Sequence, residues 1–233
     1  MVTKIHSRLR AIGIIPARGG SKSIPLKNIR SVGRRPLVDY SIDSALESAV
    51  LDRIVVSTDH SEIIKICEKR SHIDVIRRPT ELATDEAPTE LALLHACEEL
   101  ERMDGFIPDV VITLEPTSPL RTPETIRRCV EAFESKNIDS VIGIVETRAC
   151  YGKIVDGLFS YLYQDQPRRR QDRQPLYREA STIYGTRLVT LRKHMSVLGD
   201  SLYPLILPER EALDINEESD IELAEKMLEM SRN

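Results

Sequence analysis

Short, continuous apolar runs alternate along most of the chain with longer segments whose apolar residues recur at helical spacing. The apolar runs predict β-strands at 11–17, 53–59, 73–76, 109–116 and 140–146, and the periodic segments predict helices at 37–48, 60–70, 88–103 and 122–136. Strands that are apolar on both faces are typical of a parallel sheet covered by helices on both sides. The pattern therefore predicts an α/β fold with a mostly parallel central sheet.

This alternation stops after residue 146. Residues 148–180 are rich in Tyr, Arg, Gln and Asp and show no helical period, which predicts an irregular or hairpin-like extension that leaves the sheet. The regular pattern then resumes with "STIYGTRLV" and "YPLILP", and a last helix is predicted in "EESDIELAEKMLEM". The chain has no internal repeat or low-complexity linker, so we expect one domain over residues 1–233, with an inserted extension at about 148–180.

Composition narrows the class of protein. Hydrophobic residues make up 41% of the chain and charged residues 30%, with a formal net charge of -4, which disfavours a general nucleic-acid binder. The four cysteines form no CxxC pair and suit a reducing compartment. The basic start "MVTKIHSRLR" lacks the apolar stretch of a secretory signal, and no run approaches a membrane span. We therefore expect a cytoplasmic protein with no membrane and no nucleic-acid partner.

The first predicted strand runs into a glycine pair surrounded by cations, in "IIPARGGSKSIPLKN". In a parallel sheet, ligands bind beyond the carboxyl ends of the strands, where this loop would lie. Gly19 and Gly20 would let backbone amides approach an anion, and Arg18, Lys22 and Lys27 would add positive charge. The loop matches neither GxxxxGK[ST] nor GxGxxG, so a flexible surface loop is the alternative. A polyphosphate explains three clustered cations better.

Several further segments place this loop in a wider resemblance. The segments "VSTDHSEI", "RRPTELATDEAPT", "LEPTSPLRTPETI", "RRQD", "TIY" and "LDINEESDIELAE" follow it in order. Together they resemble the CMP-sialic acid synthetase, or acylneuraminate cytidylyltransferase, family over nearly the whole chain. The resemblance implies a Rossmann-like nucleotidyltransferase sheet with helices on both faces and a small dimerisation extension. It also implies the reaction of CTP with a 2-keto-3-deoxy sugar acid to give a CMP-sugar and pyrophosphate, with Mg²⁺.

The resemblance also assigns residues to the nucleotide and to catalysis. Those implied to bind CTP are Arg18, Ser21, Lys22, Lys27, Asn28 and Arg78, of which Arg18, Lys22 and Lys27 would be catalytic. Phosphoryl transfer depends mainly on positioning and on neutralising charge that builds up on the phosphoryl oxygens. For Arg78, the residues alone favour a plainer role as the partner of a nearby carboxylate.

A candidate metal site lies near the end of the chain. In "ALDINEESD", Asp214 and Asn216 occupy alternate positions, so their side chains would share one face of an extended segment. Two oxygen ligands suit Mg²⁺, which keeps several waters and adds phosphate oxygens. The family has Asp-x-Asp here, so Asn216 would keep an oxygen but remove one charge. The alternative is that Asn216 caps the last helix.

The sugar side shows two departures from the family. The residues implied to face the sugar are Thr89, Glu115, Thr117, Ser118 and Tyr184, with Lys153 and Arg170 reaching the site from a partner subunit's extension. The family usually has glutamine at Glu115, and an asparagine where this chain has Ala180. A carboxylate accepts but cannot donate hydrogen bonds, so we expect a sugar other than N-acetylneuraminate, such as a legionaminic, pseudaminic or smaller ulosonic acid.

Other readings stay open at this point. The chain could be a transferase of the same fold for another sugar acid or nucleotide. It could also be a catalytically silent nucleotide-binding relative, which the change at Asn216 alone favours. The run "PRRRQDRQPLYR", with tyrosines nearby, could bind RNA, but the acidic net charge disfavours this, and most of its arginines fit a solvated face. The residues do not identify a general base.

Overall fold

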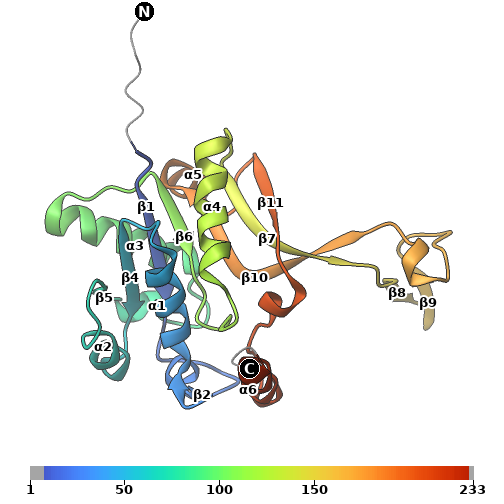
Figure 1. The fold of residues 1–233 in the computed structure, drawn as a ribbon, viewed down its shortest axis with the longest axis horizontal. Coiled ribbons are helices and arrows are strands. Elements are labelled where there is room, and N and C mark those ends of the chain that lie inside the picture. Colours follow the sequence, from blue (N-terminus) through green and yellow to red (C-terminus); the bar gives the residue numbers. More distant parts are fainter. Residues whose placement is uncertain (1–7, 231–233) are drawn as a thin grey trace, which may run out of the picture.

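A computed structural model describes residues 8–230 of the chain. Residues 1–7, which include most of the basic start, and residues 231–233 of the expected single domain lie outside the described residues. Figure 1 shows a central twisted sheet flanked by helices, with a long arm leaving it on one side. The sheet strands are β1 (Ala11–Pro16), β4 (Arg53–Thr58), β5 (Asp74–Arg77), β6 (Val110–Thr113), β7 (Ser140–Thr147), β10 (Leu176–Arg187) and β11 (Leu202–Ile206).

The sheet has the strand order β11-β7-β10-β6-β1-β4-β5. Neighbouring strands pair in parallel except where β10 lies between β6 and β7, which are both antiparallel to it. Because β1 lies near the middle of the sheet and all of its residues are buried, the loop that follows it opens at the carboxyl end of the parallel strands. This is where a ligand is expected in such a sheet.

Helices cover both faces. The helices are α1 (Leu37–Ser48), α2 (Ser61–Cys67), α3 (Thr89–Asp104), α4 (Pro123–Ser135), α5 (Leu188–His194) and α6 (Glu218–Met230). One face packs α1, α2 and α4 into the largest apolar cluster, and the other packs α3 and α5 into a second cluster. A third cluster joins α6 to α1 and to the small ribbon of β2 (Ser31–Val32) and β3 (Arg35–Pro36). These clusters fix the positions of the strands, and therefore of the loops that follow their carboxyl ends.

Local signals in the sequence set several of these boundaries. Helix α4 begins with Pro123 after Thr122, whose side chain accepts a hydrogen bond from the Thr125 amide, and this pairing is a common N-terminal helix signal. The predicted α1 matches the observed one residue for residue, and the other predicted helices and strands appear within a few residues. Helix α5, which the periodicity did not single out, follows directly on β10.

The arm is formed by the segment that breaks the sequence pattern. Strands β7 and β10 continue past the sheet as a two-stranded ribbon, and a separate hairpin, β8 (Gly152–Val155) with β9 (Leu158–Tyr161), lies at its far end (Figure 1). The segment expected to form an extension, 148–180, makes up most of this arm, and its last residues belong to β10. Among residues 8–230, no helix has both the length and the apolar character needed to cross a membrane.

Candidate active site

The loop after β1 is held in a tight path over the carboxyl end of the sheet. The Asn28 side chain donates to the Arg18 carbonyl at 2.8 Å and so ties the two ends of the loop together. Leu26 has a φ of 50°, a left-handed conformation that turns the chain into the short 3₁₀ turn Lys27–Ile29. Gly19 lies against His60, and a Cβ atom there would come within 2.6 Å of the ring. Glycine is thus needed for this close approach.

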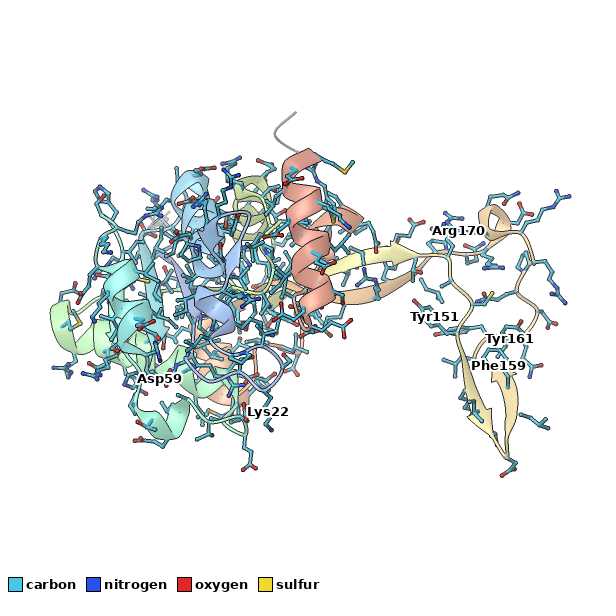
Figure 2. The ribbon with its side chains drawn as sticks, turned by 90° about the horizontal axis from the view of Figure 1, so that it is seen from below. Lys22, Asp59, Tyr151, Phe159, Tyr161 and Arg170 are labelled. Atoms are coloured by element: carbon cyan, nitrogen blue, oxygen red, sulfur yellow. The ribbon has the colours of Figure 1, made fainter. Side chains whose placement is uncertain are left out.

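Two carboxylates contact the cations and amides of this loop. Asp85 pairs with Arg18 at 2.8 Å and with Lys22 at 3.4 Å. Although partial desolvation acts to raise it, hydrogen bonds from Lys22 and Arg18 hold the pKa of Asp85 below its ordinary value. The Gly19 amide donates to the Asp59 carboxylate at 2.8 Å, so in the ligand-free chain this amide already faces an anionic side chain. Figure 2 labels Asp59 and Lys22 on this part of the molecule.

Lys27 reaches across the cleft from the other side of the loop. Its ammonium donates to the Ile215 carbonyl at 2.8 Å, which links the loop to the segment before α6. Burial lowers the pKa of Lys27, while the nearby carboxylate of Asp214 opposes this shift. Lys27 is therefore a partly desolvated cation between the glycine loop and the candidate metal segment.

Arg78 is anchored by polar groups of β4. It is 5% exposed, and its guanidinium donates to the Ser57 hydroxyl at 3.1 Å and to the Ser57 carbonyl at 2.9 Å. The expected alternative, a carboxylate partner, is not what holds it, because both bonds go to a serine. The remaining face of a guanidinium fixed in this way can present donors to the cleft.

These groups surround one cleft of about 440 Å³. All of the residues predicted to bind CTP line it: Arg18, Ser21, Lys22, Lys27, Asn28 and Arg78. The wall opposite the glycine loop is formed by Leu82, Thr84, Asp85 and Ala87. A cleft that gathers three cations from a loop of ten residues is suited to a polyanion.

A second cavity of about 340 Å³ adjoins the first. It is lined by Thr89, Glu90, Thr113, Glu115, Thr117, Ser181, Tyr184, Val197, Asp214 and Asn216. Thr89, Glu115 and Thr117 also line the first cleft, so they form the wall that the two cavities share. The structure thus brings four of the residues predicted to face the sugar together with the two predicted to bind the metal: Thr89, Glu115, Thr117 and Tyr184 with Asp214 and Asn216.

Glu115 is held in this shared wall by its backbone. Its carbonyl accepts hydrogen bonds from Ser41 at 3.2 Å and from the buried guanidinium of Arg121 at 3.2 Å. Arg121 also donates to the Thr182 carbonyl at 2.6 Å, which ties β6 to β10. The Glu115 carboxylate itself accepts no hydrogen bond from any described residue. Burial, assisted by the charge of Asp214, raises the pKa of Glu115 to about 7.

Asp214 and Asn216 share the second cavity, as their spacing predicts. The Asn216 amide donates to Asp214 Oδ2 at 3.0 Å, so this side chain does not cap α6. Asp214 Oδ1 is buried and has no hydrogen-bond partner among the described residues.

The segment that carries Asp214 is fixed at both ends. The Ile215 amide donates to the Thr117 carbonyl at 2.9 Å, and the buried carboxylate of Glu211 accepts hydrogen bonds from Thr122 and Thr125. The described residues contain no group of three or more acidic, cysteine or histidine side chains able to hold a metal. An orphaned carboxylate oxygen beside a phosphate-sized cleft nevertheless fits Mg²⁺, which takes one or two carboxylates and completes its shell with waters and phosphates.

Ser118, which is predicted to face the sugar, and Ala180, where the family has an asparagine, do not line either cavity. Ser118 is 1% exposed and lies in neither lining. Ala180 is 2% exposed and belongs to the largest apolar cluster. Its neighbour Ser181 lines the second cavity instead. Side chains alternate along a strand, so the residue that the sequence comparison singled out points into the core.

Lys153 and Arg170 lie on the arm and do not line either cavity. Figure 2 shows Arg170 near the end of the arm, well away from the body that carries Lys22 and Asp59. Arg173 donates to the carbonyls of Pro167, Arg148 and Arg168, so it is a structural brace. By contrast, the side chains of Arg168–Arg170 form no hydrogen bond or ion pair with other residues in 8–230.

Sequence reasoning missed several residues of the site. Asp59 and Asp85 contact the glycine loop, and Arg121 fixes Glu115. Asp59 is the last residue of the strand predicted at 53–59, at the edge where ligands bind, which is a usable signal. Asp85 and Arg121 give no such signal, because only the folded chain shows which distant groups they meet.

Comparison with known proteins agrees with this geometry. A family model described as cytidylyltransferase matches residues 12–196. A CMP-N,N'-diacetyllegionaminic acid synthase of Legionella pneumophila is 31% identical, covering 96% of this chain and 98% of that protein. An N-acylneuraminate cytidylyltransferase of Streptococcus agalactiae is 31% identical over 91% of this chain and 52% of its own. A pseudaminic acid cytidylyltransferase of Campylobacter jejuni is 31% identical over 93% and 95%.

Solved structures show the same fold at low sequence identity. A CMP:2-keto-3-deoxy-manno-octonic acid synthetase complexed with CTP superposes with a TM-score of 0.67 at 14% identity, covering 95% of this chain and 99% of that one. A 4-diphosphocytidyl-2C-methyl-D-erythritol synthase superposes with a TM-score of 0.71 at 13% identity over the same shares. From the family match over most of its length and these relatives, the chain belongs to the cytidylyltransferase family.

Proposed function

We propose that this protein transfers the cytidylyl group of CTP to a 2-keto-3-deoxy sugar acid, giving a CMP-sugar and pyrophosphate. The observation that carries the proposal is the junction of two cavities: a cation-lined cleft meets a second cavity at Thr89, Glu115 and Thr117. A triphosphate in the first cleft would present its α-phosphorus to an acceptor in the second. The names of the relatives supply the sugar class.

Each part of the first cleft has a role in this reaction. The anomeric hydroxyl of the sugar attacks the α-phosphorus, and the bond to the β-phosphate oxygen breaks as pyrophosphate leaves in line. Arg18 and Lys22 pair with Asp85 in the ligand-free chain. When CTP binds, its β- and γ-phosphates would replace Asp85 as their partner. Lys27, fixed on the Ile215 carbonyl, would neutralise charge at the reacting phosphate. Arg78 would contact the nucleoside, supported by Ser57.

Mg²⁺ is the cofactor that this site fits. When bound, it would neutralise negative charge on the phosphate oxygens and on the leaving pyrophosphate. Asp214 is the residue best placed to hold it, because one of its oxygens is buried without a partner.

The arm supports a homodimer as the active unit. The side chains of Ile154, Leu158, Phe159 and Tyr161 on the hairpin are 53–77% exposed. An exposed apolar group of this kind marks a protein-protein contact. Since the side chains of Arg168–Arg170 form no hydrogen bond or ion pair with the described residues of their own chain, a second subunit's cleft is a suitable destination for Lys153 and Arg170. A bidentate arginine is well suited to the sugar carboxylate.

The reaction is tested by following CTP, pyrophosphate and the nucleotide product with purified protein, Mg²⁺ and a panel of sugar acids. We expect one pyrophosphate and one CMP-sugar for each CTP consumed, with UTP and GTP much poorer substrates. The panel includes N-acetylneuraminate, legionaminic, pseudaminic and smaller ulosonic acids. Consumption of UTP or GTP at the CTP rate would favour the alternative transferase, and no nucleotide consumption with any acid would favour a silent relative.

A mixing experiment tests whether the arm acts on the partner. Lys27→Ala inactivates the cleft and leaves the arm unchanged. Arg170→Ala removes the arm's arginine and leaves the cleft unchanged. If the arm serves the other subunit, mixed dimers contain one site with both elements, and activity returns after subunit exchange. Mixing Lys27→Ala with itself is the control. If mixing restores no activity although the dimers exchange, Arg170 does not act in trans.

A further inference from the structure

Two of the acidic side chains that line the second cavity, Glu115 and Asp214, form no ion pair with any described residue, although the charges of Arg121, Arg78 and Lys27 oppose the rise in the pKa of Glu115 that burial causes. Asp214 Oδ1 is buried and unpaired, and the Glu115 carboxylate accepts no hydrogen bond from the described part of the chain. Both line the same cavity of about 340 Å³. An unpaired carboxylate out of water is costly, so a site that keeps two of them is expected to supply a cation from a ligand.

The two oxygens of Asp214 have different tasks. Oδ2 accepts the Asn216 amide at 3.0 Å, while Oδ1 has no partner. An ionised carboxylate can only accept, so Asn216 must turn its NH₂ group toward Asp214. Contacts of this kind orient metal ligands and are usually made by groups that do not bind the metal themselves. Both residues line the second cavity, but Asn216 is exposed, whereas Asp214 is partly buried and its Oδ1 atom is fully so.

Glu115 occupies the place from which a second ligand could act. It lines both cavities, so its carboxylate lies where the phosphates of a nucleotide would meet the acceptor. Its backbone is fixed by Arg121 and Ser41, which limits its freedom to turn elsewhere. Asp214 lines the same cavity, and its charge adds to the effect of burial in raising the pKa of Glu115.

We propose that Glu115 and Asp214 are the protein's two ligands to the divalent cation, and that Asn216 orients Asp214 without binding the cation. This inference rests on the proposed magnesium-dependent cytidylyl transfer and changes the expected ligand pair of Asp214 and Asn216. Two carboxylates are sufficient for Mg²⁺, because water and phosphate oxygens complete its coordination. In this proposal Glu115 binds the cation and does not contact the sugar directly, so any effect of Glu115 on the choice of sugar acts through the cation.

Direct metal binding tests the assignment. Mn²⁺ prefers the same oxygen ligands and can be titrated into the nucleotide-free protein while the free ion is measured by electron paramagnetic resonance. We expect Glu115→Gln to weaken Mn²⁺ binding at least about tenfold, as Asp214→Asn does, and Asn216→Ala to weaken it less. Glu90→Gln removes the same charge from the same cavity and should leave the affinity close to that of the wild type.

The possible results separate the assignment from its alternatives. Equal affinities for the wild type and Glu115→Gln would overturn it, as would a larger loss in Asn216→Ala. An equal loss in Glu90→Gln would show a general charge effect and also overturn it, and so would the absence of Mn²⁺ binding by the wild type. Titration of CTP in EDTA verifies that Glu115→Gln keeps a folded nucleotide cleft.

The proposed reaction is measured in parallel with pyrophosphate release. A wild type that binds Mn²⁺ with the expected ranking but releases no pyrophosphate would refute the proposed function and leave the cation site standing. A wild type that turns over CTP while Glu115→Gln keeps full Mn²⁺ affinity would refute the ligand assignment and leave the function standing.

Discussion

The two cavities of the cleft differ in how far the chain satisfies its own charges. In the first, Arg18 and Lys22 pair with Asp85, and Arg78 and Lys27 donate to backbone carbonyls. In the second, Glu115 and one oxygen of Asp214 have no partner among the described residues. The first cavity is therefore organised by this chain alone, whereas the second needs a cation, a substrate and, as we propose, a partner subunit. The first cavity is therefore suited to bind the nucleotide, whereas the second is suited to the transfer reaction.

The largest expected effect is on turnover, from Lys27→Ala in the first cavity. Removing one preorganised donor to a charged transition state costs about 10²- to 10³-fold in kcat. The Ile215 carbonyl also loses its partner, so the melting temperature is measured to separate folding from catalysis. Lys69→Ala removes the same charge from an exposed position and is the control. Unchanged turnover in Lys27→Ala would remove this residue from the reaction.

A second prediction concerns how pH affects the metal-free protein. The pKa of Glu115 is about 7 in the folded state and lies near its ordinary value of 4.5 in the unfolded chain. The stabilisation from its protonated form is thus fully present below pH 4.5 and is lost as pH rises through 7. In EDTA, Glu115→Gln should be more stable than the wild type by about 3 kcal/mol at pH 8, and the difference should disappear by pH 4.

Urea unfolding at both pH values measures this difference. The same stability gap at pH 4 and pH 8 would show that packing, and not ionisation of Glu115, is responsible. Added Mg²⁺ should narrow the gap at pH 8, because the cation stabilises the ionised carboxylate of the wild type only.

The smallest predicted effect concerns the ion pairs of Asp85 in the first cavity. Asp85 neutralises Arg18 and Lys22 at the position that we assign to phosphates. Asp85→Asn should therefore bind pyrophosphate about threefold more tightly, since exposed ion pairs contribute little and salt weakens them. Competition against CTP turnover at low and high salt measures this. Weaker pyrophosphate binding by the variant would mean that Asp85 helps to hold the ligand.

The sequence predicts the scaffold of this molecule better than it predicts the polar contacts. Apolar periodicity located α1 and β1 because burial imposes the period directly. It could not show that β10 runs antiparallel between β6 and β7, because strand order depends on long-range packing. The residues of the first cleft were also predictable, since they lie in one loop and its neighbours.

The second cavity was harder to predict, because its residues come from distant parts of the chain. Glu115 and Asn216 looked like separate departures from the family, one affecting the sugar and one affecting the metal. The fold places both beside Asp214 in a single cavity. Ala180 looked like a change at the sugar and instead lies in the core. Motif comparison gives the position of a residue but not which way its side chain points.

Calorimetric titration of CTP into the metal-free protein tests whether the cation-lined cleft is a CTP site. We expect saturable heat with one CTP for each chain, much weaker heat with UTP, and loss of the heat in Lys27→Ala, while pyrophosphate release begins only when Mg²⁺ and a sugar acid are added. If the wild-type protein gives no heat with CTP, the glycine loop and its cations do not form a cytidine triphosphate site.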